Sequence, residues 1–256
     1  ASATMHLLVG GLAGELAHCT RAETESEWSC AKESLGAAQQ VLGLWTQASG
    51  SAFALVRDGD GENMLVRRPA VSTAEVWTPE EFENCTSPGL SCDEFELAGL
   101  AMDTTGARVY ALGRNSRILG SFSSINWDDI SPDFGPESPS PEAMEFRALA
   151  EHEGLLIAVG YERQCPLESS DGDCVVTLGR WWLFVGELSA GNTVNWRVPQ
   201  LIFEQSCGSS GLNICPDDHA KSGPLAVRLN GDSGRWQIMG AIWGEMGDRG
   251  VVFWKP

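Results

Sequence analysis

A short apolar phrase recurs five times along the chain of 256 residues, and this internal repeat limits the possible folds more than any other feature. Apolar runs of four to eight residues between turn-forming residues are typical of buried strands. We therefore expect one strand for each copy of the phrase. The copies read LLVGG at 7–11, FALVR at 53–57, YALGR at 110–114, IAVGY at 157–161 and LAVRL at 225–229.

A tryptophan follows each copy of the phrase. Successive tryptophans are 49, 50, 69 and 58 residues apart. The two longer intervals contain the cysteine loops 165–174 and 207–215, so they read as insertions into a unit of about 50 residues. We expect these tryptophans to pack between neighbouring units rather than to bind a ligand. They are Trp28, Trp77, Trp127, Trp196 and Trp254.

The repeat predicts an all-β fold, a β-propeller of five four-stranded blades that forms a single domain over 1–256. Four units carry a further strand-like run before the phrase, and four strands per unit at this period are typical of propeller blades. The first unit lacks such a run, which leaves two alternatives: a five-bladed ring, or part of a larger ring. The expected units are 1–39, 40–96, 97–145, 146–205 and 206–256.

The eight cysteines form four pairs that are close in sequence, and none has the CxxC spacing of a zinc or thioredoxin site. An even count in a loop-rich chain is typical of disulfides formed in an oxidising compartment. We therefore expect four local disulfides and an extracytoplasmic protein: secreted, periplasmic or at the cell surface. The expected pairs are Cys19–Cys30, Cys85–Cys92, Cys165–Cys174 and Cys207–Cys215.

The charge of the chain argues against nucleic acid as a partner. The formal net charge is −18, whereas binding to a phosphate backbone needs a cationic face. No apolar run reaches the roughly 18 residues of a membrane span, so we expect no span. The partner that we expect is another protein or a glycan.

The repeat resembles that of the Asp-box, or BNR-repeat, propellers, a superfamily that includes sialidases and sortilin-like receptors. The family motif is S-x-D-x-G-x-x-W at the turn into the last strand of a blade. The segment 189–196 keeps Ser189 and Trp196 but has Gly191 and Thr193 in place of the aspartate and the glycine. The resemblance implies a type of blade and carries over no catalytic residue.

Function is predicted as a non-catalytic binding or scaffolding module, because no nucleophile, acid–base pair or metal set stands out. The disulfide-bearing insertions at 163–175 and 205–222 are the expected docking face, since pre-organised loops lose less entropy on binding. The first alternative is a secreted, sialidase-like hydrolase with a Tyr–Glu nucleophile pair, an acid and an arginine cluster. The second is a trypsin-like serine protease homologue, which His18, Ser222 and the GDSG phrase at 231–234 suggest.

Eight residues are candidates for ligand or metal binding. Three arginines at comparable places in their units are expected to point into one funnel, and two adjacent tryptophans would stack on a glycan. The phrase at 58–63 resembles the start of a calcium loop, although Pro69 replaces the bidentate glutamate at its twelfth position. Calcium is therefore the one cofactor considered. The candidates are Arg57, Arg114, Arg228, Trp181 and Trp182 for ligand, and Asp58, Asp60 and Asn63 for metal.

Overall fold

The structure is a computed structural model, and its regular elements in the described residues are all strands. Within that part of the chain no helix has the length and apolarity needed to cross a membrane. The prediction of an all-β protein is therefore confirmed. The described residues are 4–11, 14–36, 38, 40–47, 50–70, 76–80, 95–103, 107–114, 116–121, 127–134, 144–164, 167–168, 174–175, 178–190, 192–206, 223–230, 235–242 and 249–254.

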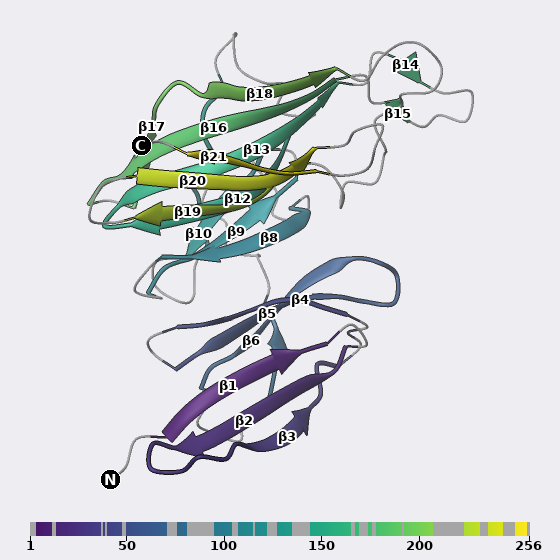
Figure 1. Ribbon diagram of the computed structural model, residues 1–256, viewed down its shortest axis with the longest axis vertical. Coiled ribbons are helices and arrows are strands. Elements are labelled where there is room, and N and C mark those ends of the chain that lie inside the picture. The colour runs from purple at the N-terminus through teal and green to yellow at the C-terminus, as the bar shows by residue number, and fades with distance from the viewer. Residues whose placement is uncertain are drawn as a thin grey trace. The chain divides into compact units, whose positions relative to one another are not determined.

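The chain forms two compact units, residues 1–84 with 105–107 and residues 85–104 with 108–256. The first unit contains two antiparallel meanders, in which each strand pairs with the next one along the chain (Figure 1). The first meander is β1 (Thr4–Gly10), β2 (Leu16–Ala22) and β3 (Ser29–Glu33). The second is β4 (Gln40–Thr46), β5 (Ala52–Arg57), β6 (Asn63–Arg68) and β7 (Thr78–Pro79).

The second unit contains three further meanders and a short ribbon (Figure 1). One meander is β8 (Leu97–Met102), β9 (Val109–Gly113), β10 (Ile118–Ser121) and β11 (Asp128–Asp129). The next is β12 (Met144–His152), β13 (Leu155–Gln164), β16 (Leu178–Leu188) and β17 (Val194–Trp196), with β18 (Gln200–Ser206) also paired to β16. The ribbon is β14 (Leu167–Glu168) with β15 (Cys174–Val175), and the last meander is β19 (Gly223–Asn230), β20 (Arg235–Ile242) and β21 (Arg249–Trp254).

Within the second unit the β12–β18 sheet packs on both of its faces. One face meets the β8–β11 meander in a core that includes Tyr110, Phe146 and Phe184, all of them fully buried. The other face meets β19 and β20 around Ile157 and Ile238. Side chains of a strand alternate between the two faces of a sheet, so a sheet covered on both sides needs apolar residues at nearly every position of its central strands.

The repeated phrase forms the second strand of its meander in the three middle copies, which lie in β5, β9 and β13. In the first and last meanders it forms the first described strand, β1 or β19. The run GLNICPD at 211–217, which we expect as the preceding strand of the last unit, lies outside the described residues. The blade count and the single domain remain predictions. The described sheets have two to five strands, and none of them is a six-stranded barrel of the kind that the protease alternative requires.

Three of the five repeated tryptophans pack against the cores as expected. Trp127 is buried, Trp196 joins the core of the second unit, and Trp77 joins that of the first. Trp28 does not follow the rule, because it lies in the turn before β3, is 39% exposed and is covered by the guanidinium of Arg21. The side chain of Trp254 lies outside the described residues.

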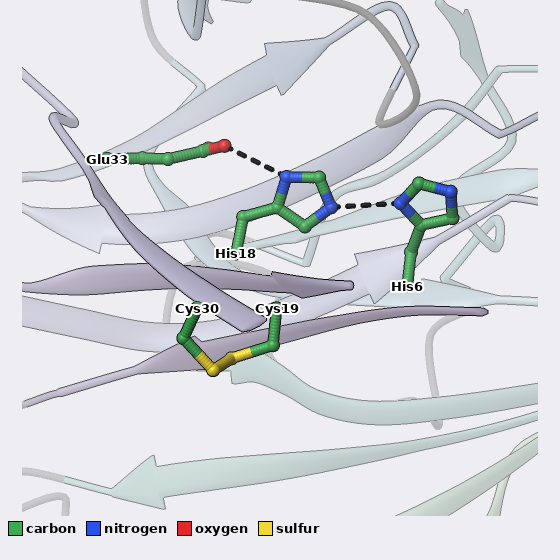
Figure 2. Close-up of a disulfide and its surroundings, with 5 residues drawn as sticks. All are labelled: His6, His18, Cys19, Cys30 and Glu33. Carbon is green, nitrogen blue, oxygen red and sulfur yellow. Dashed lines mark hydrogen bonds and ion pairs between the residues drawn. A yellow bond between two sulfur atoms is a disulfide. The ribbon is translucent and has the colours of Figure 1, made fainter. Parts of the chain in front are cut away.

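The Cys19–Cys30 disulfide joins directly paired positions of β2 and β3, which confirms the first of the four predicted bridges (Figure 2). The two half-cystines face away from the core between the two meanders of the first unit, because the neighbouring residue His18 lies on the other face of β2. The other three predicted pairs involve side chains outside the described residues, so those bridges remain predictions.

Phe184 is the residue whose truncation should cost the second unit most. Its ring has edge contacts with Phe134, Phe146 and Trp196 at centroid distances of 5.9, 5.1 and 6.5 Å. We expect Phe184→Ala to lower the free energy of unfolding by about 3–5 kcal/mol. The matched control is Val198→Ala at a residue that is 85% exposed, with an expected change below about 0.5 kcal/mol. Urea unfolding measures both, and equal losses would contradict this account of the core.

The disulfides can be tested by non-reducing peptide mapping. We expect the four local pairs, and a bridge between distant units, such as Cys30 to Cys85, would show that the pairing rule is wrong. Replacing Cys19 and Cys30 together by alanine should lower the free energy of unfolding by about 2–3 kcal/mol, because the loop that they close is short. Thermal unfolding with and without reductant gives an independent measure of the same loss.

Candidate functional site

A cluster of buried polar side chains lies where β8 and β12 end side by side in the second unit. Asp103 directly follows β8 and forms a parallel bridge with Glu151 of β12. Tyr110 of β9 and Arg108, the residue before β9, complete the group, which we call the Glu151 cluster. Exposed fractions are 8% for Asp103, 1% for Glu151 and 0% for Tyr110, whereas the Arg108 side chain is 36% exposed. The cluster therefore reaches solvent through Arg108.

A tight turn between β12 and β13 fixes the Glu151 carboxylate. Glu153 and Gly154 both have positive φ, 50° and 84°, as a two-residue hairpin of type I′ requires. The turn directs the Gly154 N–H to Oε1 of Glu151 at 2.5 Å, and Arg108 donates from Nη1 to the same oxygen at 3.0 Å. Oε2 is buried and accepts no hydrogen bond from the described residues. One oxygen of the carboxylate is thus anchored, and the other is not engaged by those residues.

Asp103 is held by the backbone of Arg108. Its Oδ1 accepts from the Arg108 N–H at 3.0 Å, and its own N–H donates to the Arg108 carbonyl at 3.1 Å. These bonds close the hairpin between β8 and β9. They also bring the second carboxylate of the cluster next to the first.

Tyr110 is a neutral phenol. Burial raises its pKa well above the usual value, the charge of Glu151 raises it further, and the guanidinium of Arg108 opposes the shift only in part. A phenol in this setting needs a base to take its proton before it can act as a nucleophile. Glu151 is the carboxylate whose charge acts on Tyr110 most strongly, ahead of that of Asp103.

A second polar cluster lies in the first unit around Glu33, at the end of β3. Glu33 forms an ion pair with Arg68 of β6, accepts from the indole N–H of Trp77 at 2.7 Å, and lies 3.2 Å from Nδ1 of His18. Burial raises the pKa of Glu33, but the hydrogen bonds from Trp77 and Arg68 and the charge of Arg68 outweigh it, so the net shift is downward. The Glu33 carboxylate is therefore a fixed anion rather than a proton donor.

His18 lies between Glu33 and His6, as Figure 2 shows. Its Nε2 is 3.0 Å from Nδ1 of His6 on β1. Burial lowers the pKa of His18, the Glu33 charge opposes that shift, and the nearby positive charge of Arg68 adds to it. The imidazole is therefore neutral at pH 7.

The three arginines predicted to share one funnel have separate surroundings. Arg57 ends β5, is exposed and donates from Nε to Oδ1 of Asn63 at 3.1 Å. Arg114 follows β9 and forms an ion pair with Glu96 at 3.2 Å. Arg228 lies exposed on β19. Their convergence on one ligand remains a prediction.

The two tryptophans proposed to stack on a glycan lie within the β12–β18 sheet. Trp181 is 2% exposed and packs against Phe203, with ring centroids 5.3 Å apart. Trp182 is partly buried and donates its indole N–H to Glu162 at 2.7 Å. Binding of a ligand by either residue remains a prediction.

The candidate calcium loop is a hairpin turn between β5 and β6. Oδ1 of Asp58 accepts from the N–H groups of Asp60 and Glu62, each at 2.9 Å. Asn63 receives the hydrogen bond from Arg57 described above. No group of three or more metal-binding side chains occurs in the part of the chain that the structure describes. Calcium binding at this turn remains a prediction.

Asp103, Arg108 and Glu151 are not among the site residues expected from the sequence. The usable signal was an acidic residue at the end of two apolar runs, LAGLAMD and FRALAEH, which are both first strands of their meanders. First strands of successive meanders lie next to each other in a propeller, so their last residues come together. The separation of 48 residues between Asp103 and Glu151 concealed this pairing.

The chain is similar to several solved structures, but it matches no known protein family. No protein-family model and no curated protein matches the chain. A GH43 β-1,3-galactosidase with galactodeoxynojirimycin matches at 8% identity over 93% of this chain and 81% of its own, with a TM-score of 0.43. A GH74 xyloglucanase from Xanthomonas campestris matches at 12% identity over 96% and 36%, with a TM-score of 0.49. A Bombyx mori GH32 β-fructofuranosidase matches at 13% over 98% and 56%, with a TM-score of 0.39.

The prediction of a non-catalytic binding or scaffolding module is contradicted by these comparisons and is not retained, because the proteins that they name are glycoside hydrolases. The likeness is remote, with TM-scores below 0.5, and it assigns no activity and no catalytic residue to this chain.

The raised pKa of Tyr110 makes the protein sensitive to alkali. Below pH 10 the phenol is neutral in both the folded and the unfolded chain, so it has no effect on stability. Above pH 10 the unfolded chain loses the proton while the folded chain keeps it, which favours unfolding. We expect the wild type to lose stability between pH 10 and pH 11 relative to Tyr110→Phe, in urea unfolding at each pH. An identical pH dependence in the two proteins would contradict the burial of this phenol.

Proposed function

We propose that this protein is a glycoside hydrolase and that the Glu151 cluster is its catalytic centre. The observation that supports the proposal is the placement of Asp103 and Glu151 at the ends of two neighbouring parallel strands, beside a tyrosine and an arginine. Hydrolysis of a glycosidic bond needs one carboxyl group to protonate the leaving oxygen and a second group to act at the anomeric carbon. This cluster contains both.

The chemistry divides among the four residues as follows. Tyr110 attacks the anomeric carbon while Glu151 takes the phenolic proton, and Asp103 protonates the leaving oxygen, so the glycosidic bond breaks as a bond to Tyr110 forms. In the second step Asp103 removes a proton from water, the water oxygen displaces Tyr110, and Glu151 returns the proton to the phenol. The sugar keeps its anomeric configuration after two displacements. Arg108 orients the Glu151 carboxylate through its hydrogen bond to Oε1.

The finer features of the protein are proposals that accompany this one. A five-bladed propeller of the Asp-box type is supported by the three meanders of the second unit, which pack face to face. An extracytoplasmic location is supported by the Cys19–Cys30 disulfide. The partner is then a glycan, as substrate.

The proposal is tested with fluorogenic aryl glycosides. The panel contains sialosides, β-galactosides, β-fructosides and β-glucosides, because Arg108, already paired with Glu151, does not by itself select an acidic sugar. We expect wild-type protein to hydrolyse at least one member, and Asp103→Asn, Tyr110→Phe and Glu151→Gln each to lower kcat by about 10²–10⁴-fold. Thermal unfolding of each variant checks that the fold is kept.

The matched control is Glu145→Gln. Glu145 is also a buried glutamate of β12, paired with Arg147 at 3.1 Å, but it lies at the opposite end of the strand. We expect its kcat to remain within about threefold of wild type. The proposal fails if no member of the panel is hydrolysed, or if the Glu151→Gln and Glu145→Gln variants have the same activity.

A further inference from the structure

His6 and His18 present two ring nitrogens to each other at the edge of the first meander. His6 lies opposite Thr20 and His18 opposite Leu8 in the pairing of β1 with β2, so the two histidines are diagonal neighbours on one face of the sheet. The rings stack at an angle of 22° with centroids 5.2 Å apart, and Nδ1 of His6 is 3.0 Å from Nε2 of His18 (Figure 2). His6 is exposed, so solvent reaches this pair of nitrogens directly.

Glu33 lies directly behind His18. Nδ1 of His18 is 3.2 Å from Oε1 of Glu33 and 3.5 Å from Nη1 of Arg68. The tautomer with its proton on Nδ1 donates to Glu33 and leaves the lone pair on Nε2, and this is the tautomer that a metal ion would take. A carboxylate behind a histidine is the usual partner of a metal-binding imidazole, because it fixes the ring and makes the free nitrogen a better donor. Arg68 and Trp77 in turn hold Glu33 in place, so this support is rigid.

The separation of the two nitrogens suits a shared metal ion. Two nitrogen ligands at metal–nitrogen distances of about 2.0–2.1 Å lie roughly 2.8–3.0 Å apart when they are cis in a square-planar or octahedral complex, and about 3.3–3.4 Å apart in a tetrahedral one. The observed 3.0 Å agrees with the cis arrangement. Without a metal ion the two nitrogens share a hydrogen bond. Metal binding therefore requires the His6 proton to be on Nε2 and the exposed His6 ring to rotate, which directs both lone pairs to one point.

The charges near the pair also suit a cation. Glu33 offsets the positive charge of Arg68, which is the cation nearest to His18 among the described residues. The chain as a whole has a formal net charge of −18, which attracts cations to its surface. Neither fact alone makes a site, but both reduce the electrostatic repulsion between a divalent ion and Arg68.

We propose that His6 and His18 form a surface site for a square-planar divalent transition-metal ion, Cu²⁺ before Ni²⁺, with water in the remaining positions. Imidazole nitrogens suit copper, and Cu²⁺ is the ion that such a ligand set binds most strongly among the divalent first-row metals. The site lies in the first unit and is independent of the Glu151 cluster. Glu33 is a positioning residue, since it acts through His18.

The test is a titration of the protein with CuCl₂ in a non-coordinating buffer, followed by calorimetry and by electron paramagnetic resonance. We expect one equivalent of Cu²⁺ with a spectrum of nitrogen ligation. We also expect at least a tenfold weaker dissociation constant in His6→Gln and in His18→Gln, and a loss of about tenfold or more in Glu33→Gln. His6 is exposed, so the first of these variants keeps its fold.

The matched control is His152→Gln, at a half-buried histidine of the second unit that lies 4.0 Å from Glu153. It should bind Cu²⁺ as the wild type does. The proposal is overturned if the double variant His6→Gln/His18→Gln binds as tightly as the wild type, if the wild type shows no nitrogen ligation, or if His152→Gln alone removes binding. Failure of the glycosidase assay would leave this result unaffected.

Discussion

The burial of both faces of the β12–β18 sheet is the constraint on which the second unit depends. Leu156, Ile157, Ala158 and Val159 of β13 are all fully buried, two on each face. A strand in this position has no solvent-facing side, so charged residues of the sheet are placed at strand ends, where an ion-pair partner can reach them. Glu145 and Glu162 lie toward one end of the sheet and Glu151 toward the other. The same constraint that builds the core thus gathers carboxylates at its borders, and one of these borders is the catalytic centre that we propose.

The sequence predicted the strands because the constraint acts locally. FALVR, YALGR and IAVGY are apolar without alternation, as central strands covered on both faces must be, and each forms the expected strand. Trp28 departed from the pattern because it lies in the turn before β3, where it stays 39% exposed. LLVGG also forms a strand, β1, but this strand is not covered on both faces. Leu7 and Val9, on the face opposite His6, are 45% and 49% exposed.

The polar clusters could not be predicted in the same way, because their members lie far apart in the sequence. Glu33 meets Arg68 across 35 residues and Trp77 across 44. Arg108 meets Glu151 across 43. None of these pairs follows a spacing that a helix or a hairpin would impose, so only the packing of one meander on the next brings them together. The Cys19–Cys30 bridge was predictable for the opposite reason, since its ends are adjacent strands joined by one short turn.

The Glu153–Gly154 turn shows how this architecture would respond to change over evolutionary time. The hydrogen bond that anchors Glu151 comes from the backbone of residue 154, so it survives most changes of side chain at residue 153 that tolerate its positive φ. It does not survive a change in the number of residues. One inserted or deleted residue would convert the two-residue hairpin into another turn type and move the N–H away from the carboxylate. Relatives that keep this arrangement should therefore differ in the amino-acid sequence of the turn but have turns of the same length.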